Sequence, residues 1–337
     1  MGGLADAILL AVVAVGSLRG AGALLRARWP RRAPATAILL WQALGLAGGL
    51  AAVGALLAIG VGGTRVARSG VAGGLATLVQ GHAVRQLLAS GEPALVTLIR
   101  LGCLFAGVSL FAVLCWVLVM AFAAAVQARN RQRELLALLA HGDPKAPGAL
   151  VVDHPAAAAY CLPGIKSQIV VSAGTLDLLA PAELAAVLAH ERAHLRARHD
   201  LVLIPFTSLR RAFPRSRVIS QAYRTVALLV EMMADDRALR VPARGSCADG
   251  SARDCCAEGR SLLARELATA LLRFGTAPTG NASTPAGALA ASEGDLTARV
   301  NRLLTPPRPL SRAAQASVVL GAAVTVALPV ILLVVTP

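Results

Sequence analysis

The stretch LAHERAHLRARHD, residues 188–200, contains two histidines and a glutamate in the order H-E-x-x-H. The surrounding apolar periodicity predicts a helix, on which positions four residues apart lie on the same face, one turn from each other. His190 and His194 therefore offer two imidazole nitrogens to one point, and Glu191 lies beside the first of them. Three interpretations fit these residues alone: a metal site, a surface helix with two unrelated histidines, or part of a membrane span.

The charges of this stretch exclude the membrane span. Asp177, Glu183, Glu191 and several arginines lie within one short region, which contains no run of about 18 apolar residues. The apolar segment LVLIPFTSL, residues 201–209, is too short to cross a bilayer. We expect it to pack in the core of a domain or to dip into the inner leaflet.

The composition of the whole chain nevertheless indicates a membrane protein. Of the 337 residues 56% are hydrophobic and 15% are charged, with a mean hydropathy of +0.65, whereas a soluble domain has about 25% charged residues. The net charge of +15 has little aromatic interleaving, and the arginines lie beside apolar blocks. We therefore interpret the charge as flanking a membrane, and we expect no direct binding of nucleic acid.

Four apolar blocks predict transmembrane helices, at residues 4–25, 35–62, 95–126 and 314–335. Positive charges gather in the connection after the first block and on both sides of residues 127–313, and few lie near the termini. By the positive-inside rule, both termini are outside the cell membrane and residues 127–313 form a cytoplasmic domain. The flanking arginines are Arg19, Arg26, Arg28, Arg31, Arg32, Arg129, Arg131, Arg133, Arg299, Arg302, Arg308 and Arg312.

The predicted cytoplasmic segment changes from strands to helices along the chain. A charged helix over 127–141 and the break HGDPKAPG precede three β-type runs, ALVVD, AAAYCL and KSQIVVSAG, which predict a small antiparallel sheet. A helical pattern then begins, with Pro181 and Glu183 suited to the first turn of the H-E-x-x-H helix. We expect further helices over 221–240 and 261–274, a polar loop over 244–260 and a flexible connection over 275–294, because of their composition.

The six cysteines show no C-x-x-C spacing and are expected to be reduced thiols rather than disulfides. Cys103 and Cys115 lie in an apolar block, and Cys161 is isolated in the sequence. Metal binding by the loop that contains Cys247, Cys255 and Cys256 is an alternative.

A third metal ligand is available in EMMAD, on the next strongly predicted helix. Glu231 completes a set of two histidines and one carboxylate, which leaves the fourth position of a tetrahedral zinc site open for water. Asp235 follows at i+4 on the same face and is placed to accept the ring N–H of a ligating histidine. The alternative is a solvated helix face with methionine contacts to the core, and Asp236 is assigned to the surface.

These residues predict one Zn²⁺ per chain and a hydrolytic role for Glu191. Zinc lowers the pKa of its bound water, and Glu191 is placed to hold that water and accept its proton. A donor for the transition state is also needed, and the candidates are Tyr223, His199 and Arg237. Asp200 either buttresses the site or ends a helix. An extended substrate is expected to pair with the edge of the KSQIVVSAG strand.

The stretch from LPGIKSQIVVSAG through LAHERAHLRARHDLVL, together with EMMADDRAL, resembles the BlaR/MecR-type membrane zinc metallopeptidases over about residues 155–240. The resemblance implies a cytoplasmic α+β, gluzincin-like peptidase domain, with His190, His194 and Glu231 as zinc ligands and Glu191 as base. In that family, antibiotic sensing leads to proteolytic inactivation of a transcriptional repressor. The sequence ends two residues after the fourth predicted span and has no S-x-x-K motif in an external domain, so we do not expect a β-lactam receptor.

The sequence therefore predicts an integral-membrane zinc endopeptidase that cuts a cytoplasmic protein, in signal transduction or repressor inactivation. One alternative is a housekeeping protease similar to the CaaX-processing and HtpX-like groups, which share H-E-x-x-H and a later glutamate. Another is a membrane signalling scaffold without catalysis, which the presence of Glu191 disfavours because a structural metal site needs no base.

Overall fold

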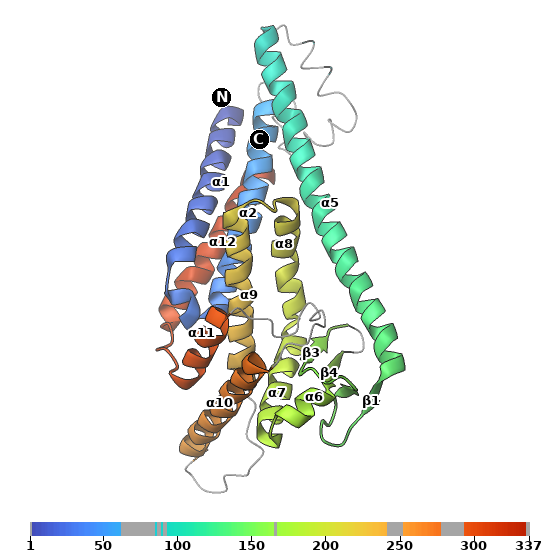
Figure 1. Cartoon of the computed structure of the whole chain (residues 1–337). Coiled ribbons are helices and arrows are strands. Elements are labelled where there is room, and N and C mark those ends of the chain that lie inside the picture. The colour runs from blue at the N-terminus through green and yellow to red at the C-terminus, as the bar shows by residue number, and fades with distance from the viewer. Residues whose placement is uncertain are drawn as a thin grey trace. The chain divides into compact units, whose positions relative to one another are not determined.

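The computed structural model describes residues 2–61, 85, 89, 93–164, 167–240, 252–277 and 293–334. The chain forms two compact units. The first contains Met1–Met120, Ser208–Val226 and Leu310–Pro337, and the second contains Ala121–Thr207 and Ala227–Pro309. Three helices, α5 (Ala94–Leu139), α8 (His199–Ala212) and α9 (Arg217–Ala238), continue from one unit into the other (Figure 1).

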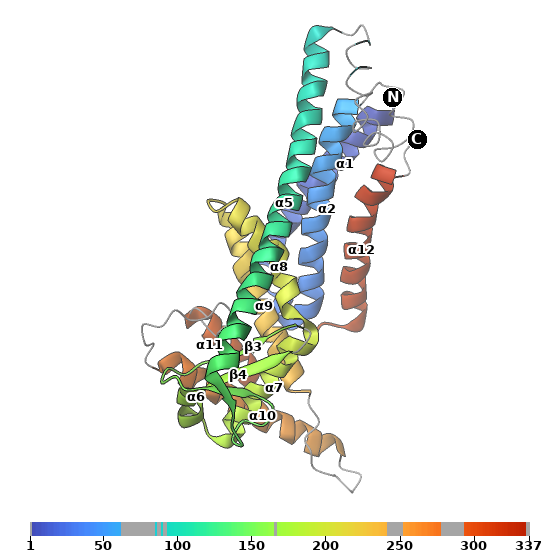
Figure 2. The ribbon, with the colours of Figure 1, turned by 90° about the vertical axis from the view of Figure 1, so that its right-hand side faces the viewer.

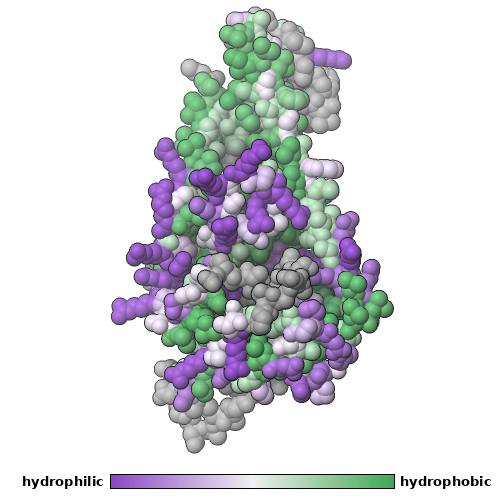
Figure 3. All heavy atoms as spheres, in the orientation of Figure 1, coloured by the Kyte–Doolittle hydropathy of each residue, from purple (hydrophilic) through white to green (hydrophobic). Residues whose placement is uncertain are grey.

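The first unit contains four helices that are long and apolar enough to cross a membrane, among the residues that were searched. They are α1 (Gly2–Arg26), α2 (Pro34–Val61), α5 and α12 (Arg312–Val334), and a short 3-10 helix, η1 (Trp29–Arg32), lies between the first two. Most residues of each apolar window are not buried inside the structure, from 61% in α2 to 89% in α5. Figure 3 shows apolar side chains over the surfaces of α1 and α5. Such surfaces suit contact with lipid rather than with water.

Helix α2 is the centre of this first unit and contacts both α1 and α12 (Figure 2). Leu10, Ala51, Ala55 and Leu332 form the shared core of these three helices. On another face, α2 approaches α5 closely at Gly60, where an added Cβ would lie 2.9 Å from the backbone nitrogen of Leu104. Small residues at such crossings let helix backbones approach each other without a hydrophobic driving force from water.

Helix α5 is longer than the predicted third span, because the apolar block and the charged helix after it are one element of 46 residues. At 1.5 Å per residue it extends for about 69 Å, whereas a bilayer core is about 30 Å thick. About half of the helix is therefore available to continue beyond a membrane, toward the first strand of the second unit.

The sheet of the second unit has four short strands in the order β1-β2-β4-β3. They are β1 (Ala140–Gly142), β2 (Leu150–Val152), β3 (Ala159–Leu162) and β4 (Gln168–Ser172). β2 and β4 are parallel, and the other two pairs are antiparallel. The prediction of a purely antiparallel sheet is therefore wrong, because β4 turns back between β2 and β3 instead of extending the sheet at its edge.

This topology also corrects the predicted substrate edge. The KSQIVVSAG run forms β4, which is hydrogen-bonded to a strand on each side and offers no free edge. β3 is one of the two terminal strands of the sheet and has no partner strand on its other side among the residues that the structure describes. β3 also contacts α7 (Pro181–Ala197), the helix that contains H-E-x-x-H.

Helix α7 begins at Pro181, as predicted. A short helix, α6 (Ala173–Leu178), precedes it and is capped by Ser172, whose Oγ accepts a hydrogen bond from the backbone N–H of Thr175 at 3.2 Å. The backbone N–H of Ala180 donates to Glu183 Oε2 at 2.8 Å, so this carboxylate satisfies a free donor at the positive end of α7.

Helices α10 (Ala252–Thr276) and α11 (Glu293–Leu304) complete the second unit. Their apolar residues pack with the sheet and α7 in one core, which contains Val171, Leu188, Leu267, Leu271 and Val300. The predicted polar loop over 244–260 is wrong from Ala252 onward, because α10 begins there. α11 was not predicted, and the prediction for residues 278–292 lies outside the described residues. The apolar residues of α11, Leu296, Val300 and Leu303, have helical spacing, but they span less than three turns and so give only a short pattern.

Candidate metal centre

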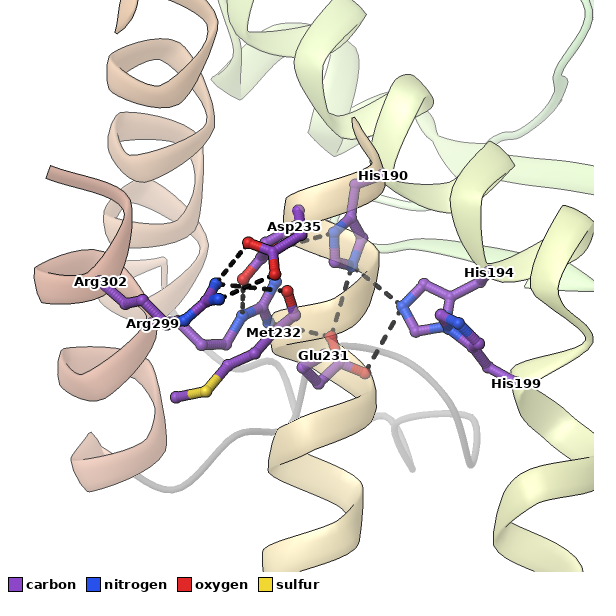
Figure 4. Close-up of polar contacts among 9 residues, drawn as sticks. His190, His194, His199, Glu231, Met232, Asp235, Arg299 and Arg302 are labelled. Atoms are coloured by element: carbon purple, nitrogen blue, oxygen red, sulfur yellow. Dashed lines mark hydrogen bonds and ion pairs between the residues drawn. The ribbon is translucent and has the colours of Figure 1, made fainter. Parts of the chain in front are cut away.

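His190, Glu191 and His194 lie on α7, and α9 brings Glu231 to the same place (Figure 4). His190 Nε2 lies 3.1 Å from His194 Nε2 and 3.3 Å from Glu231 Oε2, and His194 Nε2 lies 3.6 Å from Glu231 Oε1. His190 is only 2% exposed and Glu191 only 4%. The structure therefore brings together the three predicted ligands, which are 41 positions apart in the chain at most.

These distances fit a tetrahedral zinc site. Zinc binds histidine nitrogen at about 2.0–2.1 Å and carboxylate oxygen at about 2.0–2.2 Å, so adjacent ligand atoms should lie about 3.3–3.5 Å apart. Of the three observed separations, 3.3 Å lies at the lower end of that range, 3.1 Å lies just below it and 3.6 Å just above it. Two imidazoles and one carboxylate are also the donor set typical of catalytic rather than structural zinc, because a fourth position stays open.

Asp235 holds the ring of His190 from behind. Its Oδ1 lies 2.9 Å from His190 Nδ1, and both side chains are buried. This leaves His190 Nε2 facing His194 and Glu231, which is the orientation that a metal ligand requires. Burial by itself would raise the pKa of Asp235, but Arg299 and His190 outweigh it and lower the pKa to about 2. Asp235 is therefore a permanent acceptor for the His190 ring.

Arg299 of α11, predicted only as a membrane-flanking residue, contacts both Glu231 and Asp235 of α9. Its Nη1 lies 3.0 Å from Glu231 Oε2, its Nε donates to Asp235 Oδ2 at 3.0 Å, and its Nη2 donates to Asp235 Oδ1 at 2.7 Å. The side chain is 1% exposed. Burial favours the neutral form of Glu231, but Arg299 and the two histidines together keep its pKa well below the usual range.

His199 lies behind His194, on the side away from Glu231. Its Nδ1 lies 3.1 Å from His194 Nδ1, and its Nε2 lies 3.2 Å from Arg237 Nη1. Burial, with the neighbouring His194 and Arg237, lowers the pKa of His199 to about 3, so the ring is neutral. The role of His199 and Arg237 as transition-state donors stays a prediction, and the observed contacts also suit the orientation of the His194 ring.

The position of His199 depends on an unusual turn. α7 ends at Ala197, Arg198 adopts a left-handed conformation with φ 50° and ψ 44°, and α8 begins at the next residue. Left-handed caps are usually glycine or asparagine, because a Cβ disfavours this conformation. The turn at Arg198 brings the His199 ring against that of His194, five residues earlier in the chain.

Three other residues named in the sequence have partners outside the three-ligand group. Tyr223 belongs to the first unit, where its ring lies 4.2 Å below the guanidinium of Arg210. Asp200 is in the first turn of α8 and pairs with Arg129 at 2.9 Å, which fits the helix-end alternative. Asp236, assigned to the surface, is partly buried and pairs with Arg302 at 2.6 Å.

Cys161 provides an unexpected contact to Glu191. Its thiol, on strand β3, is hydrogen-bonded to the buried Glu191 carboxylate. Burial raises the pKa of Cys161, and the nearby Glu191 charge raises it further, so the thiol stays protonated and donates. Burial also raises the pKa of Glu191. Cys103, Cys115 and Cys161 are free thiols, and the predictions for Cys247, Cys255 and Cys256 lie outside what the structure describes.

An H-E-x-x-H helix, a carboxylate from a later helix as the third ligand and a small sheet beside them are typical of a metallopeptidase. The model of peptidase family M48 matches residues 125–303, more than half of the chain, and the chain belongs to this family. M48 enzymes are zinc metallopeptidases. The match does not confirm the BlaR/MecR type specifically. Searches of curated proteins and of solved structures gave no match.

Proposed function

We propose that this protein is an integral-membrane zinc endopeptidase that hydrolyses peptide bonds of a cytoplasmic protein. The observation that carries the proposal is the convergence of His190, His194 and Glu231 at tetrahedral spacing, with Glu191 buried beside them. A purely structural zinc site is closed by four protein ligands and needs no neighbouring base. Three ligands and an adjacent carboxylate favour catalysis.

His190, His194 and Glu231 would hold the zinc ion, which when bound supplies Lewis-acid polarisation of the substrate carbonyl and lowers the pKa of a water molecule. Glu191 takes a proton from the attacking water as the new C–O bond forms. It then gives this proton to the amine nitrogen as the C–N bond breaks. The products are a carboxylic acid and an amine, and transfer of the second water proton between them gives a carboxylate and an ammonium. Asp235 keeps the His190 ring oriented throughout.

The free edge of β3 supports a binding mode for the substrate backbone. An extended peptide can add to an exposed strand through main-chain hydrogen bonds, with little demand on its sequence. Of the two terminal strands, β1 and β3, it is β3 that carries Cys161, which contacts Glu191. A peptide added to this edge would therefore run close to the catalytic base.

The cellular placement rests on sequence and on the four apolar helices. The arginines around residues 127–313 favour a cytoplasmic peptidase domain and external termini in the cell membrane. The resemblance to BlaR/MecR-type enzymes supports a transcriptional repressor as the substrate. A housekeeping protease of the CaaX-processing or HtpX-like kind is the second candidate, favoured by the M48 match.

The function is tested on the full chain purified in detergent. We expect about one zinc per chain and cleavage of casein, loss of cleavage after treatment with a zinc chelator, and recovery when zinc is added back. Zinc content is measured by plasma mass spectrometry and cleavage by release of fluorescent peptides. Zinc at one per chain without cleavage of casein or of cytoplasmic extract would support the scaffold alternative instead.

The substrate class is tested in cells that express either the native chain or the Glu191→Gln variant. Labelling of new protein N-termini should reveal one cleaved DNA-binding protein that is intact in the variant. The measurement is quantitative mass spectrometry of both the cleaved and the uncut form. Accumulation of many unrelated membrane proteins, with no single uncut regulator, would refute the repressor proposal and favour the housekeeping role.

A further inference from the structure

We infer that Arg299 is a positioning residue for the metal centre, which orients Glu231 for zinc and balances the charges of Glu231 and Asp235 on α9. The inference rests on the proposed zinc site, but not on the reaction that the site performs. It assigns a role to α11, a helix that contains none of the predicted ligands or catalytic residues.

The geometry around Glu231 indicates how this orientation is achieved. Oε2 of Glu231 lies 3.0 Å from Arg299 Nη1 and 3.3 Å from His190 Nε2, and Oε1 lies 3.6 Å from His194 Nε2. The carboxylate is thus held between a guanidinium on one side and two imidazoles on the other, as Figure 4 shows. A glutamate side chain has several rotatable bonds, and a fixed contact reduces the number of orientations that a metal ion must select.

The second part of the role is electrostatic. Glu231 and Asp235 are four residues apart on one helix face, and their like charges repel each other in a region of low dielectric constant. Arg299 bonds to both of them, with two parallel contacts to Asp235 and one to Glu231. A planar guanidinium can satisfy these acceptors together, whereas a lysine ammonium is a point charge without this fork.

Arg302 provides a matched control on the same helix. It makes a two-contact ion pair with Asp236, at 2.6 and 2.8 Å, and this pair involves neither a predicted ligand nor Asp235. Arg299 and Arg302 therefore make similar links between α11 and α9, but only Arg299 reaches a metal ligand. A role limited to docking α11 would be shared by both arginines.

The test compares zinc affinity of the full chain, Arg299→Lys and Arg302→Lys, measured by competition with a coloured zinc chelator in detergent. Partners that orient metal ligands typically contribute about 10–100-fold to affinity, and we expect a loss in this range for Arg299→Lys. Arg302→Lys should bind zinc within about threefold of the native chain. The thermal unfolding midpoints of the two zinc-free variants should be similar.

If Arg299→Lys does not fold, Arg299→Gln removes the guanidinium and leaves Asp235 and its contact with His190 unchanged. This second variant should show a loss of zinc affinity in the same range. Native affinity in a folded Arg299 variant, or an equal loss in Arg302→Lys, would overturn the inference. Zinc binding is measured without substrate. If the unsubstituted chain binds zinc but cleaves no protein, only the proposed function is refuted.

Discussion

Replacing Glu191 with glutamine is expected to reduce peptide hydrolysis by at least about a hundredfold, because general acid–base catalysis typically contributes about 10²–10⁴-fold. Glutamine has nearly the same shape as glutamate but cannot accept the proton of the attacking water. Glu191 is buried and lies beside His190 without belonging to the three-ligand group. The variant should therefore keep its zinc, and the measurements are the initial rate of casein cleavage and the zinc content of the same sample.

Glu183→Gln is the control for this experiment, since Glu183 lies on the same helix and is also buried. Its carboxylate accepts from the backbone of Ala180 and pairs with Arg273, away from the metal ligands. The Glu183→Gln variant should cleave casein at the native rate, and its thermal unfolding midpoint should be lower than that of the native chain. Native activity in Glu191→Gln would remove Glu191 from the mechanism, and loss of zinc from it would indicate that Glu191 is itself a ligand.

Replacing Glu231 with glutamine should weaken zinc binding by more than the about 10–100-fold expected for a partner outside the ligand set. The neutral amide oxygen is a poorer donor to Zn²⁺ than a carboxylate. The substitution also leaves Arg299 Nη1 without its charged partner, although Asp235 still binds the other side of the guanidinium. Cleavage should be lost at limiting zinc and recover only partly when zinc is in large excess.

The matched control is Asp236→Asn, which makes the same chemical change five residues further along α9. Asp236 pairs with Arg302 and is not in the three-ligand group, so its zinc affinity should be native. Both affinities are measured by chelator competition at the same detergent and salt concentration. If Glu231→Gln binds zinc as tightly as the native chain, a different residue must supply the third ligand, and the mechanism would have to be rebuilt around it.

The residues of the metal group were predictable because their signals are local. H-E-x-x-H places two imidazoles on one helix face by periodicity alone. EMMAD places the ligand Glu231 and the orienting carboxylate Asp235 four residues apart on a second helix. The structure supplies the distance between these helices, which no local pattern contains. Asp235 lies where the i+4 spacing indicated, behind His190.

Arg299 and the sheet topology were not predictable for different reasons. An arginine shortly before an apolar block is typical of a membrane flank, and only the fold shows that Arg299 is buried against residues 64 positions earlier. The three β-type runs were recognisable, but their order was not, because a short strand pairs through backbone atoms that any residue provides. Cys161 had no recognisable signal, since its contact with Glu191 depends on that strand order.

The short junction between α7 and α8 couples the orientation of α8 to the geometry of the metal centre. Only Arg198 separates the two helices, so no flexible loop absorbs a rotation of α8 about its own axis. Such a rotation would displace the His199 ring and change the contact that it makes with His194. A rotation of α8 would therefore change the orientation of the His194 ligand directly, because a single residue joins the two helices.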